Sequence, residues 1–105
     1  MSPLSKEQLK HHLFLGEQSV EVCLPLPQTP LKTQQWAAHF AAAFDFSLSQ
    51  ADWGADRYQA TLTSVSTAPS IQCILCIEWL CDAIWLEPIG AQQSPRHLFN
   101  YFVQK

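Results

Sequence analysis

The stretch that decides the fold is SIQCILCIEWLCDAIWLEP, residues 70–88, which holds three of the four cysteines and two of the four tryptophans. Its isoleucines and tryptophans, together with the prolines that flank it, favour β-strand over helix. A tight turn at residues 81–82 or 82–83 would bring apolar residues from both arms onto one face. The sequence therefore predicts a β-hairpin with a shared core face. That face consists of Ile77, Trp79, Ile84 and Leu86.

The spacing of Cys73 and Cys76 is that of half a zinc site or of a thiol redox pair. In a strand, however, the two side chains point to opposite faces and lie about 10 Å apart along the chain, beyond the roughly 7 Å Cα limit of a disulfide. No second cysteine pair or nearby histidine completes a set of four metal ligands. We therefore expect buried structural thiols, with no metal and no cofactor. A helical conformation would put both thiols on one face and restore the metal or redox alternative.

The second face of the hairpin carries apolar and charged side chains together. Two helices are expected to pack on the first face, so the second face needs another cover. A homodimer would bury an exposed apolar patch simply, and another protein could do the same. The N-terminal segment is a further candidate for this cover. The expected interface has apolar residues Ile74, Cys76, Leu80 and Trp85, rimmed by Arg57, Glu78 and Glu87.

Two other interpretations of this second face stay open. Exposed carboxylates and an arginine are ordinary on a solvated sheet face, where cross-strand ion pairs contribute well under about 1 kcal/mol each. Alternatively, Glu78, Glu87 and Arg57, with the loop 52–57, form a small-molecule or enzymatic site that holds an acid/base pair. A pocket beside the two carboxylates would favour this alternative, because a docking face can be flat.

Residues 1–17 allow two conformations. Ser5 followed by Gln8 resembles a capping box, which favours a short helix that ends near Gly16. Alternatively, residues 13–15 form a strand that pairs with the next strand across a turn. We favour the short helix.

The middle of the chain predicts a strand and then a helix. Residues 19–24 alternate and are rich in β-branched side chains, as is typical of a strand. Thr29 suits the N-cap of a helix and Pro30 its first position, so we expect a helix over residues 31–44. Its apolar face repeats every four residues. This face consists of Trp36, Phe40 and Phe44.

The remaining elements complete an α+β domain. Residues 45–56 are expected to form a polar loop, residues 57–65 a strand with one wet face, and Ser94 the cap of a last helix. The order is β-α-β-β-β-α, with two helices packed on one face of a mainly antiparallel sheet and a possible short N-terminal helix. If the strand at 19–24 lay beside the strand at 57–65, the crossover would make these two strands parallel.

The composition restricts the classes of function. A chain of 105 residues is expected to be one domain, residues 1–105. Its net charge of −3 and six scattered basic residues argue against a nucleic-acid partner. The polar N-terminus is unlike a signal peptide, and no apolar run reaches the roughly 18 residues of a membrane span. We therefore expect a cytoplasmic protein that binds neither nucleic acid nor membrane.

The segments GADRY, residues 54–58, and EWLCDAIWLE, residues 78–87, look like the two richest stretches of a small uncharacterised bacterial family, a domain of unknown function. This resemblance covers most of the chain and implies a single cytoplasmic domain, but it supplies no activity and no catalytic residue. The combined expectation is a non-catalytic domain that self-associates or docks a partner protein through its sheet.

Overall fold

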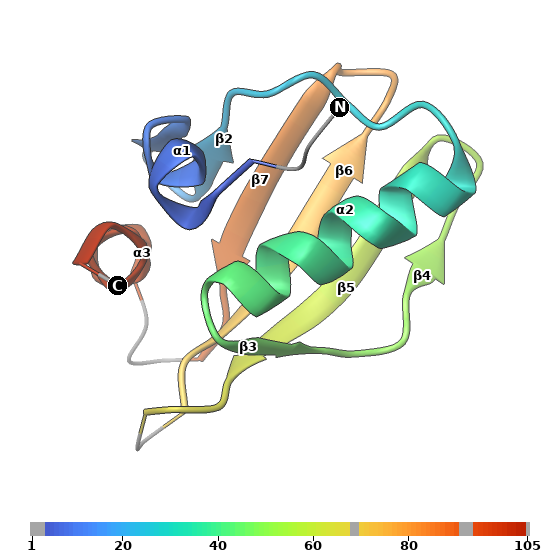
Figure 1. The fold of residues 1–105 in the computed structure, drawn as a ribbon. Coiled ribbons are helices and arrows are strands. Elements are labelled where there is room, and N and C mark those ends of the chain that lie inside the picture. The colour runs from blue at the N-terminus through green and yellow to red at the C-terminus, as the bar shows by residue number, and fades with distance from the viewer. Residues whose placement is uncertain (1–3, 68–69, 91–93, 105) are drawn as a thin grey trace.

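A computed structural model describes residues 4–67, 70–90 and 94–104 (Figure 1). Within these ranges the chain forms three helices and one mainly antiparallel sheet, which confirms the predicted α+β class. The elements are α1 (Lys6–Lys10), β1 (Leu13–Leu15), β2 (Val20–Val22), α2 (Pro30–Ala43), β3 (Phe46–Leu48), β4 (Asp52–Trp53), β5 (Arg57–Ser64), β6 (Gln72–Glu78), β7 (Ala83–Pro88) and α3 (Pro95–Gln104).

The strands lie in the order β1-β2-β7-β6-β5-β3, and β4 pairs with β5. Each of these pairs is antiparallel. The condition for a parallel pair, β2 beside β5, is not met. Instead, α2 carries the chain across the sheet to β3 at the far edge, and β5, β6 and β7 then return by antiparallel steps until β7 lies beside β2 (Figure 1).

The hairpin of β6 and β7 is the predicted one, with a longer turn. Ile77 lies opposite Ile84, and both are buried. The last pair of the ladder is Glu78 with Ala83, so residues 79–82 connect the strands where a two-residue turn was expected. A two-residue turn would have kept Trp79 and Leu80 in the alternating pattern of the strand. In the longer connection these two residues no longer belong to a strand.

Contacts of Trp79 explain the longer turn. Its indole Nε1 donates to the carbonyl oxygen of Pro27 at 2.8 Å, and its backbone N–H donates to the carbonyl oxygen of Asp56 at 3.0 Å. Both bonds hold Trp79 outside the β6–β7 ladder. Asp82 then closes the turn with φ of 51°, a left-handed conformation that aspartate tolerates better than most residues.

Both conformations considered for the N-terminal segment occur. Ser5 and Gln8 form the capping box of α1, and Leu9 on this helix is buried in the core. After α1, the chain continues into β1, which pairs with β2. The predicted helix end near Gly16 is wrong, because α1 stops at Lys10 and the strand begins at Leu13.

The predicted loop at 45–56 is also wrong, because it contains β3 and β4. Asp45 makes a sharp turn after α2 with φ of 58°, and this places the side chain of Phe46 in the core. The ring of Phe46 then packs 5.5 Å from that of Phe102 on α3. Two or three residues are too few for an alternating pattern, so the serines and aspartates of this segment concealed its strands.

The helices pack on one face of the sheet, as predicted. Phe40 of α2, Phe44 at the C-cap of this helix and Phe102 of α3 are fully buried, with ring centroids 5.0–5.6 Å apart. Thr29 caps α2, as predicted, because its side-chain oxygen accepts the backbone N–H of Lys32 at 3.1 Å. The expected helix bounds of 31–44 differ from the observed ones by one residue at each end.

The last helix also begins as predicted, because Ser94 Oγ accepts the N–H of His97 at 3.1 Å. The sequence indicates a turn at residues 66–70 and a linker at residues 88–93. Parts of both, residues 68–69 and 91–93, lie outside the described residues. Among the helices that are described, none is long and apolar enough to cross a membrane.

Candidate functional site

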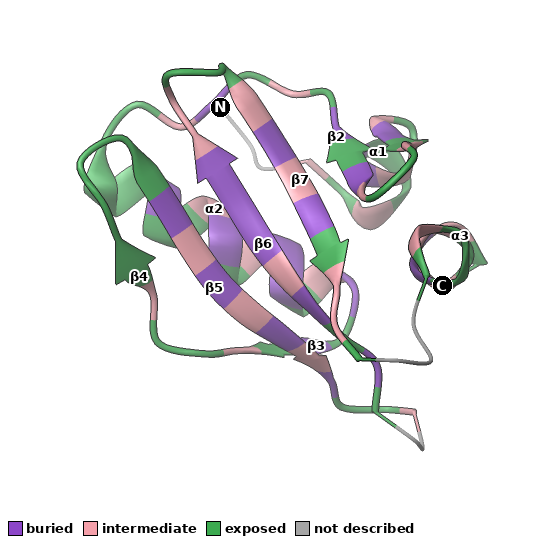
Figure 2. Cartoon of the chain, turned by 180° about the vertical axis from the view of Figure 1, so that it is seen from behind, coloured by how far each residue is buried: buried purple, intermediate pink, exposed green. Residues whose placement is uncertain are grey.

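The face of the sheet opposite the helices is covered by no described element. Figure 2 shows this face, with β5, β6 and β7 in front and α2 behind them. Alternate residues of the strands point to it, and we call it the open face. Its residues are Phe14, Glu21, Ser47, Asp52, Arg57, Gln59, Thr61, Thr63, Gln72, Ile74, Cys76, Glu78, Ala83, Trp85 and Glu87.

One row of side chains runs across the middle of the open face. The strand register places its members directly opposite one another, so each contacts the next across a strand pair. Phe14 at one end has 51% of its surface exposed, and Trp85 near the centre is half-buried. From β1 to β5 the row reads Phe14, Glu21, Trp85, Cys76 and Gln59.

The apolar patch on this face is smaller than predicted. Ile74 and Trp85 lie on the open face and are half-buried, as the alternation indicated. Leu80 does not lie there, because it belongs to the connection 79–82, where 79% of its surface is exposed. Ile74 and Trp85 therefore supply the accessible apolar surface at the centre of the face, and Phe14 supplies it at the edge.

Cys76 is on the open face but has no exposed surface. Gln59 Nε2 lies 3.7 Å from its Sγ, and Trp85 is its neighbour on β7. Burial, and next the negative charge of Glu87, raise the pKa of the Cys76 thiol to about 11. At neutral pH this thiol is protonated, so it is not a nucleophile.

Cys73 faces the opposite side of the sheet, as predicted, and is also fully buried. Burial raises the pKa of its thiol to about 12. The two cysteines are therefore separated by the sheet itself. Within the described ranges, no group of three or more His, Cys, Asp or Glu side chains could hold a metal ion.

The exposed thiols lead to a first prediction. At pH 7.5 a maleimide should label Cys23 and Cys81 in the native protein, while the two buried thiols react only after unfolding. Cys81 should react more slowly than Cys23, because its hydrogen bond to Glu78 raises its pKa and lowers the thiolate fraction. Peptide mass spectrometry over a time course measures each site. In Glu78→Gln the rate at Cys81 should rise, and fast native labelling of Cys76 would contradict the burial described above.

The predicted carboxylates lie far apart on the open face. Glu78 is opposite Arg57 and Ala83 at one end of the hairpin, whereas Glu87 is opposite Ile74. Four strand positions separate these two points on β6, which is about 13 Å. This backbone separation is unfavourable for two carboxylates that share one proton or act as an acid/base pair on one small substrate.

Arg57 stands apart from Glu87 for the same reason, since it belongs to the Glu78 end of the hairpin. In the adjacent loop 52–57, Trp53 packs edge-on against buried Tyr58, with ring centroids 4.9 Å apart. This loop is therefore a short hairpin with an aromatic contact, in which Gly54 N–H donates to the carbonyl oxygen of Arg57 at 2.8 Å. No pocket near Arg57 and Glu78 accompanies it among the grooves described next.

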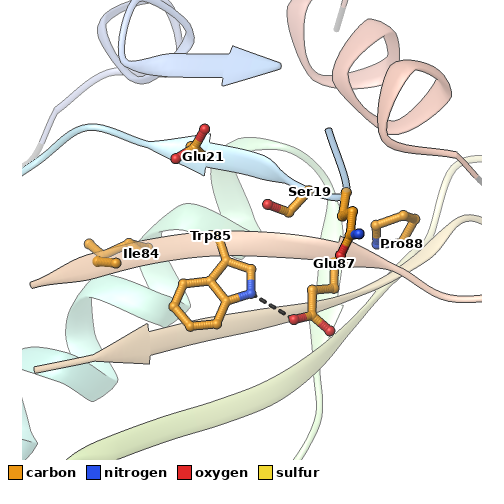
Figure 3. Close-up of a pocket in the computed structure, with 8 residues that line it drawn as sticks. Ser19, Glu21, Ile84, Trp85, Glu87 and Pro88 are labelled. Atoms are coloured by element: carbon orange, nitrogen blue, oxygen red, sulfur yellow. Dashed lines mark hydrogen bonds between the residues drawn. The ribbon is translucent and has the colours of Figure 1, made fainter. Parts of the chain in front are cut away.

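A groove of about 470 Å³ lies on the open face between β2 and β7 (Figure 3). Trp85 and Glu87 come from β7, and Trp85 Nε1 donates to Glu87 Oε1 at 2.8 Å. Glu21 comes from β2, directly opposite Trp85. Sequence reasoning did not place Glu21 at the site, because the pairing of β2 with β7 joins residues more than sixty positions apart. The other lining residues are Gln18, Ser19, Ala83, Ile84 and Pro88.

No protein-family model, curated protein or solved structure matches this chain significantly. The resemblance of residues 54–58 and 78–87 to an uncharacterised bacterial family thus stays a prediction. Any inference about function rests on the geometry of the open face.

Proposed function

We propose that the chain is a non-catalytic docking domain whose open face binds another protein. The observation that supports this most is an uncovered face that displays aromatic and aliphatic surface, with Trp85 and Ile74 half-buried and Phe14 more than half exposed. Aromatic side chains at the centre of a face, surrounded by polar groups, are typical of protein interfaces. The distance between Glu78 and Glu87 disfavours the enzymatic alternative.

The charges of the open face favour another protein over a second copy of the chain. Among its described residues the face carries four carboxylates, on Glu21, Asp52, Glu78 and Glu87, and one guanidinium, on Arg57. Packing two copies face to face would bring eight carboxylates together with two guanidinium groups. Like charges at an interface cost several kcal/mol when they are juxtaposed, so a partner of opposite charge fits this face better.

A peptide-display selection tests the docking function. The immobilised full chain is used to select binders from a random library of extended peptides. The affinity of each selected peptide is then measured for the native chain, for Trp85→Ala and for Leu31→Ala. Binding should weaken at least tenfold in Trp85→Ala, because a central buried aromatic residue is the usual hot spot. It should stay within about twofold in the control Leu31→Ala, which removes an exposed apolar side chain from α2 on the other face. Selected peptides that bind Trp85→Ala as well as the native chain would contradict the proposal.

The oligomeric state gives the second test. Light scattering after size exclusion should show a monomer, since the charges of the open face oppose its self-association. A dimer that Trp85→Glu dissociates would show instead that the partner is a second copy of the chain. Such a result would restore the homodimer expected from the sequence and overturn the assignment to another protein.

A further inference from the structure

The indole N–H of Trp85 in the groove is already hydrogen-bonded within the protein. Trp85 Nε1 donates its proton to Glu87 Oε1, and this bond fixes both the ring and the carboxylate (Figure 3). The indole therefore has no free donor for a ligand, and the groups left to bind one are its aromatic surface and the remaining carboxylate oxygens. An aromatic surface beside carboxylates attracts a cation, because the face of an indole ring is electron-rich.

The carboxylates of the groove have no cationic partner among the described side chains. Glu21 and Glu87 both line the groove and are exposed. Over the described ranges, the ion pair found within 4 Å is that of Lys10 with Glu7, which lies on α1. Arg57 belongs to the Glu78 end of the hairpin and does not line the groove. The groove thus presents negative charge that no ion pair with a described residue neutralises.

The groove is also elongated along the strands. A second hollow of about 390 Å³ adjoins it and shares three of its lining residues, Glu21, Ala83 and Ile84. Together the two hollows follow β7 from Pro88 to Ala83 and reach Asp82 in the connection before it. An extended segment, which advances about 3.3 Å per residue, follows such a path with alternate side chains directed into the groove.

We propose that this groove binds an extended segment of a partner protein that places an arginine or lysine side chain over Trp85, between the Glu21 and Glu87 carboxylates. The proposal rests on the docking function above and names the chemistry of the partner. A guanidinium stacks on the indole and bonds to carboxylate oxygens on either side, so arginine satisfies the site best. Exposed Phe14, next to Glu21 in the cross-sheet row, offers an apolar contact beyond the carboxylates.

The test uses two blocked pentapeptides that differ at one position. The first carries a central arginine, and the second carries citrulline, which keeps the planar shape of arginine but has a carbonyl oxygen in place of one guanidinium nitrogen and no charge. Binding to the full chain is measured from the NMR signal of the Trp85 indole N–H, which is assigned by its loss in Trp85→Phe. The arginine peptide should bind at least fivefold more tightly than the citrulline peptide at low salt. This difference should shrink as salt is raised to about 0.5 M, because salt screens exposed charges.

Three variants test which carboxylates cause the tighter binding of the arginine peptide. Glu21→Gln and Glu87→Gln should each weaken binding of the arginine peptide two- to fivefold and leave the citrulline peptide unchanged. The control Asp56→Asn removes the same charge from an exposed loop outside the groove and should change neither affinity. Equal affinities of the two peptides, or equal losses in Asp56→Asn, would overturn the proposal.

Failure of this inference is distinguishable from failure of the docking function. The display selection can yield peptides that need Trp85, contain no basic residue and bind Glu21→Gln normally. Such peptides would support the docking function but contradict the preference of the groove for a cation. Selected peptides whose affinity does not change in Trp85→Ala would contradict the docking function itself.

Discussion

Phe40→Ala should lower the free energy of unfolding by about 3–5 kcal/mol, the usual cost of deleting a buried phenylalanine ring. Phe40 is fully buried, and it is the residue of α2 at which the aromatic cluster converges. Its ring stacks on Trp36 at 5.3 Å and packs 5.0 Å from Phe44 and 5.6 Å from Phe102. Loss of this one ring therefore weakens the contact of α2 with α3 as well as with the sheet.

The loss should be measured by urea unfolding at pH 7 with far-UV circular dichroism, because changes near Trp36 would alter the fluorescence. Since small domains are stable by only about 5–15 kcal/mol, Phe40→Ala should be close to unfolded at 37 °C. The matched control is Leu31→Ala on the same helix, where 63% of the side chain is exposed and the change should stay within about 0.5 kcal/mol. A cost below about 1 kcal/mol for Phe40→Ala would mean that this cluster is not the centre of the core.

Local patterns in the sequence predicted the longer elements. The four-residue repeat of Trp36, Phe40 and Phe44, with the cap at Thr29, located α2 because capping and periodicity depend only on neighbouring residues. The alternation within residues 70–88 predicted the hairpin and the opposite faces of Cys73 and Cys76 for the same reason. These signals are complete within about twenty residues, and they needed no knowledge of the rest of the fold.

Features that depend on distant residues were not predictable in this way. β3 and β4 are strands because β5 offers them an edge, and neither has enough residues to show a period of its own. Leu80 was placed on the open face because a two-residue turn was assumed, and the bond of Trp79 to Pro27 made the turn longer. A hydrogen bond from the Trp79 side chain to a backbone carbonyl 52 residues away leaves no mark in the local pattern.

The candidate site also combines residues that a local pattern predicted with a residue that depends on a distant strand pairing. Trp85 and Glu87 were placed on one face from the alternation of a single strand, and the structure confirms their common face. Glu21 completes the groove only because β2 pairs with β7, and this pairing follows from how α2 crosses the sheet. The sequence therefore predicted half of the groove, while the interface role of the whole face stays a prediction.

Alkaline pH should destabilise the protein through its buried thiols. Burial raises the pKa of Cys73 from 9.0 to about 12 in the folded chain, so this thiol is neutral in both folded and unfolded states below pH 9. Above pH 9 the unfolded state loses the thiol proton while the folded state keeps it, and ionisation then favours unfolding. The contribution is thus fully present below pH 9 and is lost between pH 9 and about 12, at up to about 1.4 kcal/mol per pH unit for this group. Cys76, whose pKa is raised to about 11, adds a similar loss over a narrower window.

The effect of Cys73 is isolated by comparing the native chain with Cys73→Ala under reducing conditions at pH 7, 8, 9, 10 and 11. At pH 7 the variant should be the less stable of the two, because it leaves a cavity in the core. The difference in unfolding free energy should then shrink above pH 9, since the variant has no thiol to ionise at this position. Cys23→Ala is the matched control, because this cysteine is exposed, and its difference from the native chain should stay constant over the same range. A constant difference for Cys73→Ala from pH 7 to 11 would show that the Cys73 thiol ionises as easily in the folded core as in the unfolded chain, contrary to its complete burial.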